Sequence, residues 1–165
     1  MRLALIGPRA AGKTSVAPAL AKSFGCPCFD LDTAIEAVVG EPLAPFIERA
    51  GWQAFRIVEL ETFAQLLRAD DFVLACGAGI VETQAARHLL LEATDHRLWL
   101  DLSPSDQALR LGDQNHRPPL HPELSQAAEL AHLDELRRPL YAELASRRID
   151  ASLALPKVIT ACLKS

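Results

Sequence analysis

The sequence has few aromatic residues, no surplus of basic charge and no long hydrophobic run. Only 5% of its 165 residues are aromatic although 50% are hydrophobic, so the core must be aliphatic. A platform that stacks nucleic-acid bases needs aromatic side chains, and nucleic acids or anionic membranes need concentrated positive charge. The formal net charge is −4. These shortages argue against nucleic acid and membranes as partners and favour a globular enzyme.

Membrane spans, signal peptides and the usual cysteine or histidine metal sites are also missing from the sequence. No stretch approaches the roughly 18 apolar residues of a membrane helix, and the run 3–6 is too short for a signal peptide. The four cysteines form no C-x-x-C pair, Cys26-Pro27-Cys28 is too tight for a usual zinc site, and no H-E-x-x-H occurs. We therefore expect a cytoplasmic protein with reduced cysteines, and its length predicts one domain over 1–165.

The chain is organised around the stretch 7–14, which reads Gly-Pro-Arg-Ala-Ala-Gly-Lys-Thr between a short apolar run and an amphipathic helical pattern. This is the pattern G-x-x-x-x-G-K-[ST] in its expected setting. Gly7 and Gly12 permit turns that a Cβ would obstruct, so consecutive N–H groups face one concavity at a helix N-terminus. Lys13 adds charge for the β- and γ-phosphates, and the Thr14 hydroxyl can ligate Mg²⁺. The motif predicts a phosphate site; a glycine turn that merely contains a lysine is the alternative.

Apolar runs alternate with helical patterns along the whole chain. We predict strands at 3–6, 28–32, 72–76, 98–102 and near 149. Helices are predicted from about 13 to 24, at 33–39, 43–50, 53–68 and 82–92, after 103, at 125–147 with a kink or break at Pro139, and from 156. This alternation indicates an α/β fold with a doubly wound parallel sheet, whose sites lie at the carboxyl ends of the strands. The polar, proline-bearing stretch of about 112–124 is predicted to be a mobile lid.

Two carboxylates, Asp30 and Asp32, end the second predicted strand. The chain turns at a strand end, so each can take a different role. One could hold Mg²⁺ through water while the other meets an acceptor hydroxyl group. The alternative is an N-cap of the following helix, which Asp32 could provide.

Several arginines can bind anions. Arg56 and Glu59 are helical neighbours that either form a plain ion pair or serve a substrate carboxylate, with Glu59 orienting Arg56. Arg117 in the lid could close over the γ-phosphate, a contact worth about 10³ to 10⁵ in rate where it is used, or it could be solvated. One of the two neighbouring cations Arg137 and Arg138 could join Arg56 in a carboxylate clamp, and Arg110 could stack on adenine or remain in solvent.

In order and spacing these residues resemble shikimate kinases, which are small P-loop enzymes. The resemblance is carried by 7–14, 30–32, Gly51, Phe55, Arg56, Glu59, 77–79, Arg110, Arg117, Arg137 and Tyr141, and it spans nearly the whole chain. It implies a three-layer α/β/α P-loop NTPase fold with five parallel strands in the order 2-3-1-4-5. It also implies transfer of phosphate from ATP to shikimate, giving ADP and shikimate 3-phosphate, with an acceptor-binding helical segment of about 32–62.

The resemblance assigns a role to each matching position. The catalytic residues would be Lys13, Asp32 and Arg117. The nucleotide would be held by Gly7, Ala10, Ala11, Gly12, Lys13, Thr14, Ser15, Arg110 and Arg117, and Mg²⁺ by Thr14 and Asp30. The acceptor would be held by Asp32, Arg56, Glu59, Gly77, Ala78, Gly79 and Arg137.

Three positions depart from the pattern of the family. Ala78 replaces the middle glycine of the substrate loop, Trp52 stands where an acid is usual, and Ala10 replaces a common glycine at a phosphate-loop position that the motif leaves free. The first two lie on the acceptor side. Two alternatives therefore stand beside a shikimate kinase: a kinase of the same fold acting on another hydroxy acid such as gluconate, and an ATP-binding relative without catalysis. In each case we expect a monomer.

Overall fold

A five-stranded parallel sheet in the order β2-β3-β1-β4-β5 forms the centre of the molecule, and this confirms the predicted strand order. The computed structural model describes residues 1–112 and 117–164. The strands are β1 (Arg2–Ile6), β2 (Cys28–Asp30), β3 (Phe72–Ala75), β4 (His96–Asp101) and β5 (Arg147–Asp150). The helices are α1 (Lys13–Phe24), α2 (Leu31–Val39), α3 (Leu43–Leu66), the short 3-10 helix η1 (Ile80–Glu82), α4 (Gln84–Ala93), α5 (Pro104–Leu111), α6 (Gln126–Leu144) and α7 (Leu155–Leu163).

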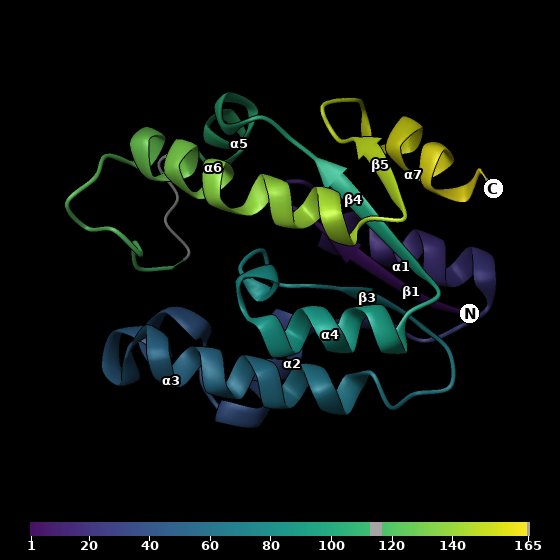
Figure 1. Ribbon diagram of the computed structural model, residues 1–165, viewed down its shortest axis with the longest axis horizontal. Coiled ribbons are helices and arrows are strands. Elements are labelled where there is room, and N and C mark those ends of the chain that lie inside the picture. The colour runs from purple at the N-terminus through teal and green to yellow at the C-terminus, as the bar shows by residue number, and fades with distance from the viewer. Residues whose placement is uncertain (113–116, 165) are drawn as a thin grey trace.

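Helices cover both faces of the sheet, so the three-layer arrangement is confirmed (Figure 1). Along β1, Leu3 and Leu5 pack into one hydrophobic cluster while Ala4 and Ile6 pack into another, as successive strand residues face opposite ways. Helices α1 and α7 complete the first cluster, and α2, α3, α4 and α6 complete the second. Within the described residues, no helix has the length and apolar character needed to cross a membrane.

The predicted element boundaries need two corrections, at β2 and at α6. Strand β2 ends at Asp30, whose side chain accepts a hydrogen bond from the Thr33 N–H at 3.2 Å, so Asp30 rather than Asp32 is the N-cap of α2. The helices predicted at 43–50 and 53–68 are confirmed as the two helical parts of α3, which are separated at Gly51, where φ is 85° and ψ is 162°. Helix α6 continues through Pro139 and ends at Leu144, so no break occurs there.

Parallel strands bring their carboxyl ends to one edge of the sheet, and the predicted site residues follow those ends. The phosphate loop follows β1, Asp30 ends β2, and the Gly77–Gly79 loop follows β3. Ligands of open α/β sheets bind at this edge. The described part of the predicted lid, 117–124, precedes α6 and contains no regular helix or strand, while its residues 113–116 lie outside the described part of the chain.

Candidate active site

The phosphate loop takes its shape from two glycines with left-handed backbone angles. Gly7 has a φ of 139°, and a Cβ added to it would lie 2.4 Å from the backbone oxygen of Leu100 in β4. Gly12 has a φ of 91° and immediately precedes α1, which begins at Lys13. A side chain at either position would strain the backbone, and at Gly7 it would also collide with the neighbouring strand. Both fixed glycines of the motif therefore have a local structural cause.

Lys13 lies at the floor of this loop. Its Nζ donates hydrogen bonds to the backbone oxygens of Gly7 at 2.8 Å and Pro8 at 2.7 Å. Burial of the ammonium group lowers the pKa of Lys13 to about 8, while Asp32 acts in the opposite direction. Because this pKa lies close to neutral pH, a charged group that binds in the loop can change the protonation state of Lys13.

Thr14 and Asp30 place two oxygen atoms side by side. The Thr14 hydroxyl donates to Asp30 Oδ2 at 2.7 Å. Mg²⁺ prefers such hard oxygen ligands and usually keeps waters and substrate phosphates in its shell. Among the described residues, no group of three or more His, Cys, Asp or Glu could hold a metal alone. The pair therefore fits a Mg²⁺ ion whose shell is completed by a nucleotide and water.

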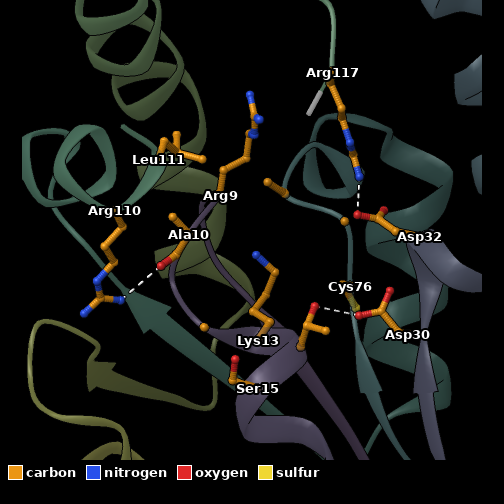
Figure 2. Close-up of a pocket in the computed structure, with 14 residues that line it drawn as sticks. Arg9, Ala10, Lys13, Ser15, Asp30, Asp32, Cys76, Arg110, Leu111 and Arg117 are labelled. Atoms are coloured by element: carbon orange, nitrogen blue, oxygen red, sulfur yellow. Dashed lines mark hydrogen bonds and ion pairs between the residues drawn. The ribbon is translucent and has the colours of Figure 1, made fainter. Parts of the chain in front are cut away.

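A cleft of about 480 Å³ opens above the loop and is called the central cleft here (Figure 2). Its volume falls within the range of about 300–1,000 Å³ that is typical of small-molecule sites. It is lined by Arg9, Ala10, Gly12, Lys13, Thr14, Ser15, Asp30, Asp32, Cys76, Gly77, Ala78, Arg110, Leu111 and Arg117. The fold thus brings most of the predicted donor residues to one cavity with both carboxylates, while Gly7 and the buried Ala11 lie in the loop itself.

Arg117 and Asp32 face each other across the central cleft (Figure 2). Arg117 donates to Asp32 Oδ2 and forms an ion pair with it. The Arg117 guanidinium also lies over the Phe55 ring, 5.6 Å from its centroid. The second carboxylate oxygen, Asp32 Oδ1, has no hydrogen-bond partner among the described residues. Arg117 therefore occupies one oxygen of this carboxylate, and the other oxygen is available to accept a hydrogen bond.

Arg56 and Glu59 form the predicted helical ion pair, with Arg56 Nη1 2.6 Å from Glu59 Oε2. Glu59 is 1% exposed, and burial raises its pKa while Arg56 lowers it. The pair packs closely against the loop after β3. A Cβ added to Gly79 would lie 2.2 Å from Arg56 Nη2, and a Cβ added to Gly77 would lie 2.6 Å from Glu59 Oε1. These two glycines are therefore needed for the close approach of Arg56 and Glu59.

Ala78, the departure in this loop, fits its backbone. Among the described residues, Ala10 is the only non-glycine with a positive φ, so Ala78 is not in the left-handed region. The Ala78 backbone oxygen accepts a hydrogen bond from the buried Tyr141 hydroxyl at 2.6 Å, and burial raises the pKa of Tyr141. Tyr141 also stacks on Trp99. The methyl group of Ala78 thus replaces a glycine without backbone strain.

A second, smaller cavity adjoins this loop and is called the arginine cavity. It is lined by Arg9, Trp52, Arg56, Ala78, Gly79, Arg117, Pro118, Leu120, Glu129, Leu133 and Arg137. Its volume of about 30 Å³ exceeds the roughly 10–15 Å³ needed for one water, so it fits a small anionic group rather than a whole metabolite. The buried Arg137 forms an ion pair there with Glu82.

Trp52, the other departure, joins α3 to the segment 117–124. Its indole Nε1 donates to the Pro119 backbone oxygen across a long 3.4 Å, and its ring meets Phe55 edge-on. The Arg56 guanidinium lies over the Trp52 ring, 5.6 Å from the centroid. A residue that is usually acidic is here an aromatic wall of the arginine cavity.

Arg110 lies at the edge of the central cleft and bridges two loops. It donates to the backbone oxygen of Ala10 at 3.0 Å (Figure 2). It also donates to the backbone oxygen of Ala151 at 2.6 Å. These bonds connect the phosphate loop to the segment after β5. They hold the guanidinium beside the cleft, where its stacking on adenine stays a prediction.

Reasoning from sequence missed three residues of the site. Arg9 lines both cavities, although the loop motif leaves its position free. Glu82 pairs with Arg137, and Tyr141 holds the Ala78 carbonyl group. The available signal for Arg9 was a cation at a free position inside a phosphate loop. The pairings of Glu82 and Tyr141 depend on contacts between α6 and the loop after β3, which local patterns do not reveal.

Comparison with known proteins agrees with this geometry. The family model described as shikimate kinase matches residues 9–165. A shikimate kinase of Marinomonas sp. is 34% identical over 157 residues, covering 94% of this chain and 85% of that protein. One from Coxiella burnetii is 36% identical over 142 residues, covering 86% and 79%.

Solved structures give the same result. A shikimate kinase from Acinetobacter baumannii in complex with shikimate has a TM-score of 0.90 at 28% identity, covering 98% of this chain and 90% of that one. A gluconokinase from Sinorhizobium meliloti has a TM-score of 0.63 at 18% identity and covers 98% and 89%, so it shares the fold. The match of the family model over almost the entire length, together with these relatives, shows that the chain belongs to the shikimate kinase family.

Proposed function

We propose that this chain transfers the γ-phosphoryl group of ATP to the 3-hydroxyl group of shikimate. The observation that carries the proposal is the convergence of two unlike sites: a phosphate loop with Lys13 lines the same cleft as Asp32, and the arginine cavity adjoins it. A protein that only binds a nucleotide needs no second, cationic site beside an acid. Membership of the shikimate kinase family names the acceptor.

On the donor side, the loop N–H groups and Lys13 hold the β- and γ-phosphates. Thr14 and Asp30, whose oxygens lie 2.7 Å apart, would hold Mg²⁺. When bound, the ion neutralises charge on the phosphate oxygens. Arg110, beside the loop, would lie against adenine.

On the acceptor side, the volume of the arginine cavity matches the substrate carboxylate, and the ring then lies toward the central cleft. Arg56 and Arg137 bind the carboxylate, while Glu59 orients Arg56. The loop Gly77–Gly79 contacts the ring hydroxyl groups with its backbone. This arrangement places the reacting hydroxyl group beside Asp32.

In the transfer itself, the acceptor oxygen forms a bond to the γ-phosphorus as the bond from that phosphorus to the bridging oxygen of ADP breaks. The hydroxyl proton passes to Asp32, whose Oδ1 has no other hydrogen-bond partner among the described residues. Lys13 and Arg117 stabilise the charge on the transferring group. For this to happen, Arg117 must exchange its contact with Asp32 for one with the phosphoryl group.

An assay that couples ADP release to turnover tests the proposal, with Mg²⁺-ATP and a panel of hydroxy acids that includes shikimate and gluconate. We expect shikimate-dependent turnover, and Asp32→Asn should lower kcat by about 10² to 10⁴ for a lost acid–base group while ATP still binds. Turnover with gluconate alone selects the first alternative. ATP binding with no turnover of any acid selects the non-catalytic one. We also expect a cytoplasmic monomer, which size-exclusion chromatography with light scattering tests for the oligomeric state.

A further inference from the structure

Arg9 occupies the second free position of the phosphate loop and stands where the two cavities meet. It is half-buried and lines both the central cleft and the arginine cavity. Figure 2 shows its side chain leaving the loop on the side away from Ser15. The loop motif places no demand on this position. Arg9 therefore adds a cation that phosphate binding does not require.

The other arginines of the arginine cavity have carboxylate partners, whereas Arg9 has none among the described residues. Arg56 pairs with Glu59, Arg117 with Asp32 and Arg137 with Glu82. Within residues 1–112 and 117–164, the Arg9 guanidinium makes no hydrogen bond or ion pair. Its five N–H donors lie in the fixed fork that matches a carboxylate or phosphate group.

The surroundings of Arg9 favour an anion. Burial lowers the pKa of Arg9, and the nearby Arg117 and Arg137 lower it further, against the opposing effects of Glu129 and Asp32. Glu129, the carboxylate that lines the arginine cavity, is engaged elsewhere because its Oε1 accepts from the His121 N–H at 2.7 Å. A partly buried cation beside two like charges is costly unless an anion joins it. Among the described arginines of the arginine cavity, Arg9 is thus the one without a hydrogen-bonded carboxylate partner.

We propose that Arg9 is an acceptor-binding residue whose guanidinium contacts the carboxylate of the substrate together with Arg137. The inference rests on the proposed function, because it takes the occupant of the arginine cavity to be the acceptor's carboxylate. The contact would place one anchor of the acceptor on the same loop that carries Lys13. The phosphate loop of this chain would then hold both substrates.

The test compares shikimate with its carboxamide, which has the same ring but no negative charge. Steady-state kinetics are measured for the wild type, Arg9→Gln, Arg9→Lys and the control Arg148→Gln, whose exposed side chain pairs with Asp101. We expect Arg9→Gln to raise the KM for shikimate by about 10- to 100-fold, as for a lost hydrogen bond to a charged group. The KM of Arg9→Lys for shikimate should lie between the values of the wild type and Arg9→Gln, since lysine keeps the charge but lacks the fork of N–H donors. The KM for the carboxamide and the KM for ATP should hardly change.

Each result decides the question. The proposed contact is overturned if Arg9→Gln keeps the wild-type KM for shikimate, or if the KM rises equally for shikimate and its carboxamide. If the KM for ATP rises instead, Arg9 contacts the phosphates. If the wild type does not use shikimate, the proposed function fails by itself. The same comparison is then made with the acid that the panel selects and its carboxamide, and absence of any acceptor acid overturns both proposals.

Discussion

Backbone groups build the phosphate loop, whereas charged side chains build the arginine cavity. The loop is one contiguous stretch, and its shape depends on two glycines with left-handed backbone angles. The cations of the arginine cavity come from the phosphate loop, α3, the segment 117–124 and α6. A change in one loop residue therefore acts through backbone strain, while a change in the arginine cavity acts through charge.

The phosphate loop and the arginine cavity also differ in how their positive charges are balanced. Lys13 bonds to neutral carbonyl groups of its own loop, so its charge is not neutralised there by an ion pair. Among the described residues that line the arginine cavity, three of the four arginines form ion pairs with carboxylates of the protein. An anion that enters the arginine cavity therefore has to share the arginines with these carboxylates or displace the carboxylates. Substrate specificity thus depends on the ion pairs of Arg56, Arg117 and Arg137.

Among the changes that test this contrast, the removal of Arg56 should give the largest effect, and it tests whether the arginine cavity depends on charge. Arg56→Ala removes a carboxylate contact, so the KM for the acceptor should rise by about 10- to 100-fold. It also leaves Glu59, which is 1% exposed, without its cation, which should lower the free energy of unfolding by about 1–3 kcal/mol. Steady-state kinetics and urea denaturation measure the two effects.

The double variant Arg56→Ala/Glu59→Gln separates those effects. Replacing the buried carboxylate by a neutral amide should restore much of the stability, because no unpaired charge remains. The KM for the acceptor should stay high. If kinetics recover together with stability, Arg56 and Glu59 are only a helical ion pair and the clamp is refuted.

Glycine substitutions in the loop after β3 should give the next largest effect. Gly79→Ala puts a Cβ where Arg56 lies, 2.2 Å from Nη2, and Arg56 is held from behind by Glu59. We expect the KM for the acceptor to rise about tenfold, toward the lower limit for a weakened charged hydrogen bond, with the KM for ATP unchanged. The matched change Ala78→Gly should leave both KM values near wild type, because Ala78 has no left-handed φ to relieve. Equal effects of the two variants would show that the loop does not position Arg56.

The fold was predictable because local patterns and chain order determine it. Alternating strands and helices predicted the parallel sheet, and the motif at 7–14 predicted the loop that follows β1. The errors were local: Asp30 caps α2 although Asp32 was proposed, and α6 passes through Pro139 because tertiary packing can override the cost of a proline. The strand order came from the family resemblance and is confirmed.

For the site, the sequence predicted which residues lie close together but not which of them form pairs. Asp32, Arg117 and Lys13 line one cleft as expected. Pairings between distant segments were not predictable, and Arg137 with Glu82, 55 residues apart, is an example. Ala10 shows a further limit, since the motif treats its position as free while the backbone there has a φ of 61°.

The pH dependence of kcat/KM for ATP tests the charge of Lys13 in the phosphate loop. Because burial lowers the pKa of Lys13 to about 8, the charged form is lost as the pH rises through that value. We expect kcat/KM for ATP to be flat below pH 7 and to fall by about tenfold between pH 8 and pH 9.5, as it reports ionisations of the free enzyme. Circular dichroism across the same range checks that the fold persists. A profile that stays flat to pH 10 would mean that Lys13 titrates as an ordinary lysine.

The smallest effect should come from Ala10→Gly, which relieves backbone strain without touching a charged side chain. An L-residue in the left-handed region costs about 1–2 kcal/mol, and glycine recovers this at an entropic cost of about 0.5–1 kcal/mol. The net gain of roughly 0.5–1 kcal/mol should raise the Tm by about 1–4 °C for a chain of this size. Ala11→Gly is the control: Ala11 is 3% exposed and has no positive φ, so the same chemical change should lower the Tm. If both variants lower the Tm alike, the loop stores no strain at Ala10, and its departure from glycine has no energetic consequence.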